Sequence, residues 1–231
     1  MSNTQYLSAH DRLRELPPVF LSADLSMRYG WRSQMTAAYL SRWKKQGLIR
    51  PLGGRSGVYF NLVADPIWEK HLEGAIRLAM PSAIEIGAAP LHEGGITTQR
   101  AYVRDLALPY EAPAYTIEGF QNHERGIRWF KAIHPHVIPG EMPRLTPVAA
   151  LADILTSQDP KLWMPDPDDI DFDILETQDL LLLENLVNQL GGANEIHWDP
   201  ALDPEENYEQ ILHARMRAAH HKALDPQQTP R

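Results

Sequence analysis

Apolar side chains recur with a helical period in the first part of the chain. Within residues 33–46 the positions spaced three to four residues apart, as on one buried helix face, are Thr36, Ala37, Leu40 and Trp43. Residues 8–16 and 22–30 show similar patterns, and they end at Pro17 and Gly30, residue types that stop helices. Ser22 and Ser33 stand at two of the starts and predict N-caps there. We therefore expect three helices before residue 47.

The period then changes to that of short strands. The segments "LIRPL" and "GVYFNL" are β-prone, and "GGRSG" joins them with glycines that supply the positive φ of a hairpin turn. Arg55 lies at the tip of this hairpin. Three helices followed by a hairpin is the order of a winged helix-turn-helix, in which the third helix enters the major groove and the wing lies along the DNA backbone.

The rest of the chain predicts a larger mixed domain, so the expected fold class is α+β. Helical patterns cover residues 66–80, 146–155, 177–190 and 204–224. Strands are predicted at "AYVRDLAL", "AYTIEG" and "IRWFKAI". The expected division is a winged helix-turn-helix domain at 1–62, a mixed α/β domain at 63–224 and a disordered tail at 225–231.

The charge is distributed unevenly along the chain. The 231 residues carry a net charge of −8, yet residues 1–60 hold nine Lys and Arg against three Asp and Glu, or +6. Residues 61–231 therefore carry −14. Such asymmetry indicates an anionic partner for one part of the chain only. Chance clustering of solvated charges is the alternative.

Composition excludes several classes of protein. The chain has no cysteine, so disulfides, thiolate catalysis and cysteine zinc sites are excluded. No apolar run approaches the roughly 18 residues that cross a bilayer, and the N-terminus lacks the basic-then-apolar pattern of a signal peptide. We expect a cytoplasmic protein with no membrane partner.

The candidate DNA-binding residues lie on the third helix and the hairpin. Forked or amide side chains at the start of such a helix read base edges, and Lys and Arg contact phosphates. The candidates are Arg32, Ser33, Gln34, Tyr39, Arg42, Lys44, Lys45, Arg50 and Arg55. Alternative roles stay open, because Ser33 can serve as a cap and Lys44 and Lys45 can complement the helix dipole.

Catalytic and metal-binding motifs are weak. The acidic run at 166–173 lacks the central glycine and closing glutamate of a calcium loop, so a solvated turn before a helix is the preferred interpretation. The close histidine pairs lack HExxH spacing, and no serine or glycine-rich loop fits a known catalytic motif. His92 and Glu93 form a possible acid–base pair, with a helix-terminal polar pair as the alternative. We expect no enzyme activity and no cofactor.

Three segments carry a resemblance to a known family. "PSAIEIGAAPLHEGGITTQ", "RWFKAIHPHVI" and "MPRLTPVAALADIL" follow the N-terminal module in this order. Together they resemble the AbiEi-family antitoxins, the regulators of type IV toxin–antitoxin systems, over roughly residues 18–155.

The resemblance implies a DNA-binding head that represses its own operon and a second domain that neutralises a nucleotidyltransferase-like toxin, without a stable complex being required. The expected partner is double-stranded DNA with an inverted repeat, bound by two copies of a monomer or weak dimer. The alternatives are a regulator with a ligand-sensing or dimerisation domain and no toxin, a nuclease, and a winged helix that binds only protein.

Overall fold

The chain divides into two units in space. The computed structural model describes residues 8–192 and 196–224, without the side chains of Met216 and residues 218–224. One unit comprises Met1–Ala83 and Ala112–Glu118, and the other comprises Ile84–Glu111 and Gly119–Arg231. The predicted tail at 225–231 lies outside the described residues. The α+β class is confirmed, because both units combine helices with a sheet.

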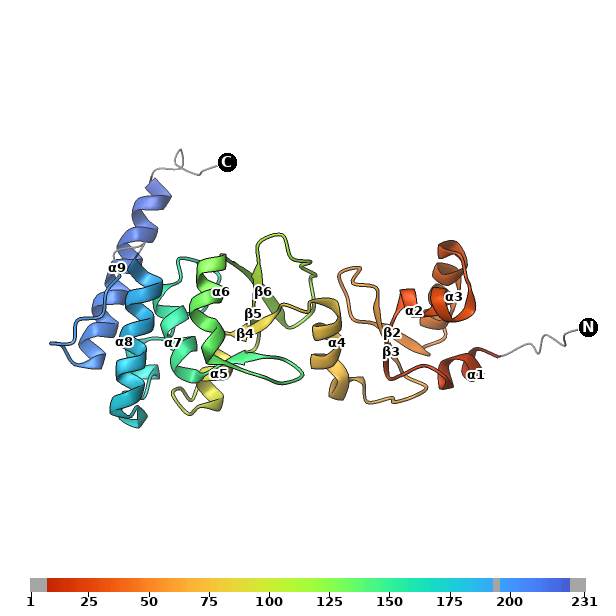
Figure 1. Ribbon diagram of the computed structural model, residues 1–231, viewed down its shortest axis with the longest axis horizontal. Helices are drawn as coiled ribbons and strands as arrows, with labels where there is room; N and C mark the ends of the chain where they lie inside the picture. Colours follow the sequence, from red (N-terminus) through yellow and green to blue (C-terminus); the bar gives the residue numbers. More distant parts are fainter. Residues whose placement is uncertain (1–7, 193–195, 225–231) are drawn as a thin grey trace, which may run out of the picture. The chain divides into compact units, whose positions relative to one another are not determined.

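Within residues 8–83 the first unit combines a helical cluster with an antiparallel sheet (Figure 1). The strand order is β1–β3–β2, and β3 pairs antiparallel with both neighbours. The elements are α1 Ala9–Arg14, β1 Val19–Leu21, α2 Ser22–Tyr29, α3 Ser33–Lys45, β2 Ile49–Pro51, β3 Val58–Asn61, the 3-10 turn Trp68–His71 and α4 Leu72–Ala79.

The turn between α2 and α3 follows from one glycine. Gly30 adopts the left-handed conformation, with φ of 65°, which ends α2 and redirects the chain. The predicted serine caps are wrong by one residue, because Leu21 and Arg32 occupy the N-cap positions. At the first of these, the Asp24 carboxylate accepts a hydrogen bond of 2.8 Å from the Leu21 amide.

A buried asparagine fastens α1 to the sheet. The Asn61 side-chain amide donates hydrogen bonds to the carbonyl oxygens of Leu13 and Leu16, at 2.7 and 3.1 Å. Its own oxygen accepts from the Val63 amide at 3.2 Å. These bonds link carbonyls at the end of a short helix to the sheet, and the Leu13 oxygen also accepts from the Leu16 amide at 3.0 Å.

The first unit extends beyond the boundary that the sequence predicts at residue 62. Residues 63–83 belong to it because α4 packs against β1 and β3. A helix with the apolar face of Ala75 and Ile76, both fully buried, needs a partner surface, and this sheet supplies it.

The second unit is built on a mixed five-stranded sheet. Its strand order is β6–β5–β4–β8–β7, in which β5–β6 and β4–β8 are parallel while β4–β5 and β7–β8 are antiparallel. The strands are β4 Ile84–Ile86, β5 Arg104–Pro109, β6 Phe120–Arg125, β7 Val137–Ile138 and β8 Arg144–Leu145. The helices are α5 Ala88–Glu93, α6 Ile127–Ile133, α7 Pro147–Thr156, α8 Thr177–Gly191 and α9 Pro204–Leu224, with 3-10 turns at His134–His136, Pro167–Asp169 and Phe172–Ile174.

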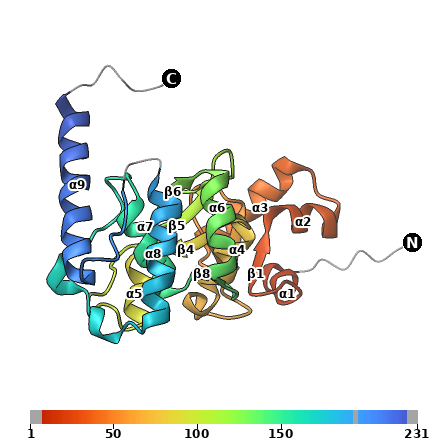
Figure 2. The ribbon, with the colours of Figure 1, turned by 60° about the vertical axis from the view of Figure 1, so that its left-hand side comes forward.

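Helix α7 is the centre of this unit. Every residue from Val148 to Thr156 is buried, and the helix contacts α5, α8 and α9 (Figure 2). A helix that is buried on all sides requires neighbours all around it. Among the described residues, no helix combines the length and the apolar character needed to cross a bilayer.

Two predicted strands of this unit are wrong. "IRWFKAI" forms α6, with Trp129, Ala132 and Ile133 buried at helical spacing. "AYTIEG" forms no strand, and most of it, residues 114–118, belongs to the first unit. Short apolar runs fit both a helix and a strand. Here Gly126, immediately before Ile127, is the N-cap of a helix.

A network of hydrogen-bonded charges lies inside the second unit. The Asp153 carboxylate on α7 accepts from the Trp129 indole at 2.6 Å and from the Arg125 guanidinium at 3.1 Å. Beside it, the His123 ring faces Asp105 through Nε2, at 2.7 Å, and Asp159 through Nδ1, at 2.8 Å. A histidine that donates from both nitrogens is an imidazolium.

The pKa values follow from this arrangement. Burial lowers the pKa of His123, but the hydrogen bonds to Asp105 and Asp159 outweigh burial and leave it above 6.5. Burial raises the pKa of Asp159, but its bond with His123 outweighs this and leaves it below 3.8. Because the pKa of His123 is raised, its contribution to stability is fully present below pH 6.5. Because the pKa of Asp159 is lowered, its contribution is fully present above pH 3.8.

We therefore predict that the His123 contribution to the free energy of unfolding is lost as the pH rises through its raised pKa. Urea unfolding of the wild type and of His123→Gln should differ more at about pH 6 than at about pH 9. A single proton changes the free energy by at most about 1.4 kcal/mol per pH unit. The exposed His134→Gln serves as the control, and an equal difference for His123→Gln at both pH values would contradict the prediction.

Candidate nucleic-acid interface

One face of α3 is fixed by the core. Thr36, Leu40 and Trp43 are buried, and Trp43 is fully enclosed. Leu40 and Trp43 pack in the cluster that contains Phe20 and Leu25. Because a helix repeats every 3.6 residues, the face opposite this stripe must point to solvent.

The solvent face of α3 carries small side chains between polar ends. The exposed residues of α3 are Ser33, Gln34, Met35, Ala37, Ala38, Ser41, Arg42, Lys44 and Lys45. The predicted burial of Ala37 is wrong. Ala38 and Ser41 are not among the predicted residues, because small residues in a helix give no chemical signal by themselves.

In the described part of the first unit, the basic side chains of α3 and the β2–β3 hairpin form no ion pairs, whereas the acids of residues 8–60 are hydrogen-bonded or paired elsewhere. The Asp11 carboxylate accepts from the Ser8 hydroxyl at 2.6 Å, and Glu15 pairs with Arg28 at 3.1 Å. Helix α3 contains no Asp or Glu. Among the described residues, the predicted DNA-binding cations form no ion pair: Arg32, Arg42, Lys44, Lys45, Arg50 and Arg55.

Eight of the nine predicted DNA-binding residues are exposed. They form a group at the start of α3, a group at its end and a pair on the sheet: Arg32, Ser33, Gln34; Arg42, Lys44, Lys45; Arg50, Arg55. The Arg42 guanidinium lies 5.6 Å from the centre of the Tyr39 ring, and that of Arg50 lies closer to an aromatic ring, at 4.0 Å from the centre of Trp68. That contact holds the charge against the first unit's own surface.

Tyr39 does not belong to the exposed face. Its ring stacks on Trp31 with centroids 4.2 Å apart and planes inclined by 12°, and Trp31 stacks in turn on Tyr29. The guanidinium of Arg12 lies 5.7 Å from the Tyr39 ring centre. The expected exposure of Tyr39 is therefore wrong, because its ring is half-buried and closes an aromatic cluster beside α1. Its contact with DNA stays a prediction.

A groove rich in hydroxyl groups runs beside α3. It has a volume of about 500 Å³ and is lined by α2, α3 and the sheet. The hydroxyls of Ser26 and Thr36 lie 2.9 Å apart at its base. Burial raises the pKa of Tyr59, which also lines it, so this phenol is a neutral donor. Hydroxyls of this kind suit contacts with phosphate oxygens.

The hairpin tip has an unusual backbone. Arg55 is exposed with a φ of 62°, and it follows Gly54, whose φ is 56°. A Cβ on Gly54 would lie 2.8 Å from the Thr116 backbone nitrogen, so only glycine fits there. Segment 115–117 of the first unit thus supports the hairpin and fixes where Arg55 stands.

The other motifs do not form sites together. The His92 ring bonds to the Thr97 carbonyl oxygen at 3.2 Å, while Glu93 pairs with Arg144. Within residues 8–192 and 196–224, no three His, Asp or Glu side chains are arranged to hold a metal ion.

Comparison with known proteins adds no assignment. No protein-family model matches the chain, and no curated protein is significantly similar to it.

The aromatic cluster leads to a prediction about Tyr39. Tyr39→Ala removes the stack on Trp31 and should lower the free energy of unfolding by about 1–3 kcal/mol. Tyr39→Phe keeps the ring and should leave it nearly unchanged. Urea unfolding followed by tryptophan fluorescence measures both, with Gln34→Ala as the exposed control on the same helix. A Tyr39→Ala protein as stable as Gln34→Ala would exclude the structural role.

Proposed function

We propose that the first unit is a winged helix-turn-helix that binds double-stranded DNA, with α3 as the recognition helix and the β2–β3 hairpin as the wing. The order α1, β1, α2, α3, β2, β3 supports this proposal, since it brings a strand before the second helix to complete a three-stranded sheet. The observation that carries it is the solvent face of α3, which lacks acids and ends in unpaired cations.

The shape of α3 favours a groove over a flat partner. The side chains in the middle of the exposed face are short, so the backbone of α3 can approach base edges closely. They are Ala37, Ala38 and Ser41. Gln34 stands in the first turn, where residues of a recognition helix contact bases, and its amide can pair with adenine. Arg42 and Lys45 lie further along the same face and meet phosphates or guanine.

Around this helix, contacts with the DNA backbone complete the interface. Arg32 at the N-cap and Lys44 at the edge of the hydroxyl groove contact phosphates, and Arg55 on the wing does the same or enters the minor groove. Arg50 contributes least, because Trp68 already holds its guanidinium. Two copies bind an inverted repeat in the promoter of their own operon.

On the resemblance to AbiEi-family antitoxins, we extend the proposal to a cytoplasmic autorepressor that is also the antitoxin of a type IV pair. The second unit then neutralises a nucleotidyltransferase-like toxin, and the protein is not an enzyme. The alternative is a regulator whose second unit senses a ligand and has no toxin partner. A pocket in that unit favours keeping this alternative.

DNA binding is tested with overlapping duplex fragments from upstream of the protein's own gene. Gln34→Ala and Arg42→Ala should each weaken binding to the operator fragment by about 1–3 kcal/mol if they contact bases. Ala38→Glu should weaken it more, because a carboxylate on the helix face would meet the phosphates. Fluorescence anisotropy at fixed salt measures the affinities.

The matched control is Arg28→Ala, since Arg28 is an exposed arginine of the same unit whose charge is paired with Glu15. Its affinity for DNA should stay close to that of the wild type. If Gln34→Ala, Arg42→Ala and Ala38→Glu all bind as the control does, α3 is not the recognition helix.

The antitoxin role is tested separately with the same full-length variants. Ala38→Glu should derepress a reporter under the operon's promoter, yet still rescue growth of cells that express the adjacent gene of the operon. The physical reason is that the substitution changes only an exposed position of the first unit. Loss of rescue with an intact fold would contradict this division of labour.

A further inference from the structure

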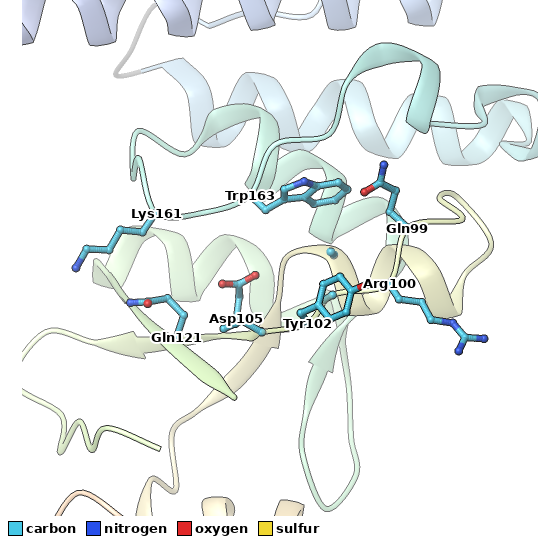
Figure 3. Close-up of a pocket in the computed structure, with 10 residues that line it drawn as sticks. Gln99, Arg100, Tyr102, Asp105, Gln121, Lys161 and Trp163 are labelled. Atoms are coloured by element: carbon cyan, nitrogen blue, oxygen red, sulfur yellow. The ribbon is translucent and has the colours of Figure 1, made fainter. Parts of the chain in front are cut away.

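The second unit contains a pocket of about 360 Å³ (Figure 3), a size that suits a small organic ligand. Its lining comes from α5, the loop before β5, the strands β5 and β6, and the segment that carries Lys161 and Trp163. The proposed DNA interface does not involve these residues.

A carboxylate is held in place on one side of the pocket. The Asp105 side chain is 7% exposed, and its Oδ1 accepts from His123 Nε2 at 2.7 Å. The other ring nitrogen of His123 bonds to Asp159, so the histidine cannot turn away. Gly87 makes room on the other side, because a Cβ there would lie 2.5 Å from Asp105 Oδ2. The carboxylate is therefore preorganised as an acceptor for N–H donors.

Two aromatic side chains flank this carboxylate. Figure 3 shows the Trp163 indole across one side of the pocket, with Asp105, Gln121 and Tyr102 on the other side. Tyr102 is completely exposed, so the fold gains no buried area from its ring. A planar heterocycle between such rings is stabilised by stacking.

Two cations stand at opposite ends of the pocket. Figure 3 shows the Lys161 and Arg100 side chains extending outwards from it. In the described part of the chain neither forms an ion pair. Both are long side chains whose charged ends can reach an anionic group at the mouth.

These features together define the chemistry of the ligand. The cations disfavour a cationic ligand, and Asp105 disfavours a simple anion in the interior. The ligand that fits these groups is a planar ring with N–H donors for Asp105 and, away from them, a negative charge for a cation. We propose that this pocket binds a mononucleotide, with guanine the best base because two adjacent N–H groups can meet one carboxylate.

The proposal is tested by calorimetric titration of the full-length protein with guanosine 5′-monophosphate. Guanosine, adenosine 5′-monophosphate and ribose 5-phosphate should each bind at least tenfold more weakly, since each lacks one recognised part. Tyr102→Ala and Lys161→Gln should weaken binding of the guanine nucleotide at least fivefold. Both positions are exposed, so the fold should tolerate these changes.

Tyr110→Ala is the matched control, because Tyr110 is an exposed tyrosine of the same unit that does not line this pocket. The absence of binding at millimolar concentration for every nucleotide would overturn the proposal. Equal affinity in Tyr102→Ala, Lys161→Gln and the control would also overturn it. A guanine-containing single strand that binds more tightly than the free nucleotide would assign the pocket to a base on a strand. The operator assay reports on the first unit, so its failure and the failure of this titration are separate results.

Discussion

The packing of Trp43 into the first unit's core decides what the rest of that unit presents to solvent. With Leu40 and Thr36, it fixes the rotation of α3 about its own axis. Rotation by one residue, about 100° on a helix, would move Ala37 and Ser41 toward the core and bring Tyr39 outwards. The chemistry of the exposed face therefore depends on an apolar contact on the opposite face.

The basic character of that face also depends on where the acids are used. Asp11 and Asp24 cap helices, and Glu15 pairs with Arg28, so none of the three acids in residues 1–60 is left to neutralise α3. Capping carboxylates contribute to stability through orphan backbone amides and the helix dipole. The same assignments leave the positive charge of the unit concentrated on α3 and the hairpin, where it can attract a polyanion.

The sequence predicts this unit well because its signals are local. Gly30, the stripe on α3 and the glycines around Arg55 each determine a local conformation, and the helices and hairpin follow from them. The strand at Val19–Leu21 gives only three residues of pattern and needs β3 as a partner, so it is missed. Tyr39 is misplaced because its burial depends on Trp31, which lies outside the helix.

Prediction from the sequence fails more often in the second unit, because its elements depend on contacts between residues that are far apart in the chain. "IRWFKAI" has the composition of a strand, but Trp129 becomes helical because its indole reaches Asp153 on α7. The pocket cannot be seen in the sequence at all, since Asp105, Gln121 and Trp163 are brought together only by the parallel pairing of β5 and β6 and the segment after α7. His123 shows no motif either, and its importance appears only once two carboxylates face it.

The burial of carboxylates affects how the net negative charge of residues 61–231 is interpreted. Asp105, Asp153 and Glu85 are buried against cationic partners, so part of the −14 carried by residues 61–231 is structural. Buried carboxylates of this kind fix side chains in one arrangement, and removing one partner leaves an uncompensated charge. The negative charge that remains at the surface repels a phosphate backbone, which disfavours DNA contacts by this part of the chain. A pocket for one nucleotide is compatible with that repulsion, because Lys161 and Arg100 act at short range while the net charge acts over the longer distances that salt screens.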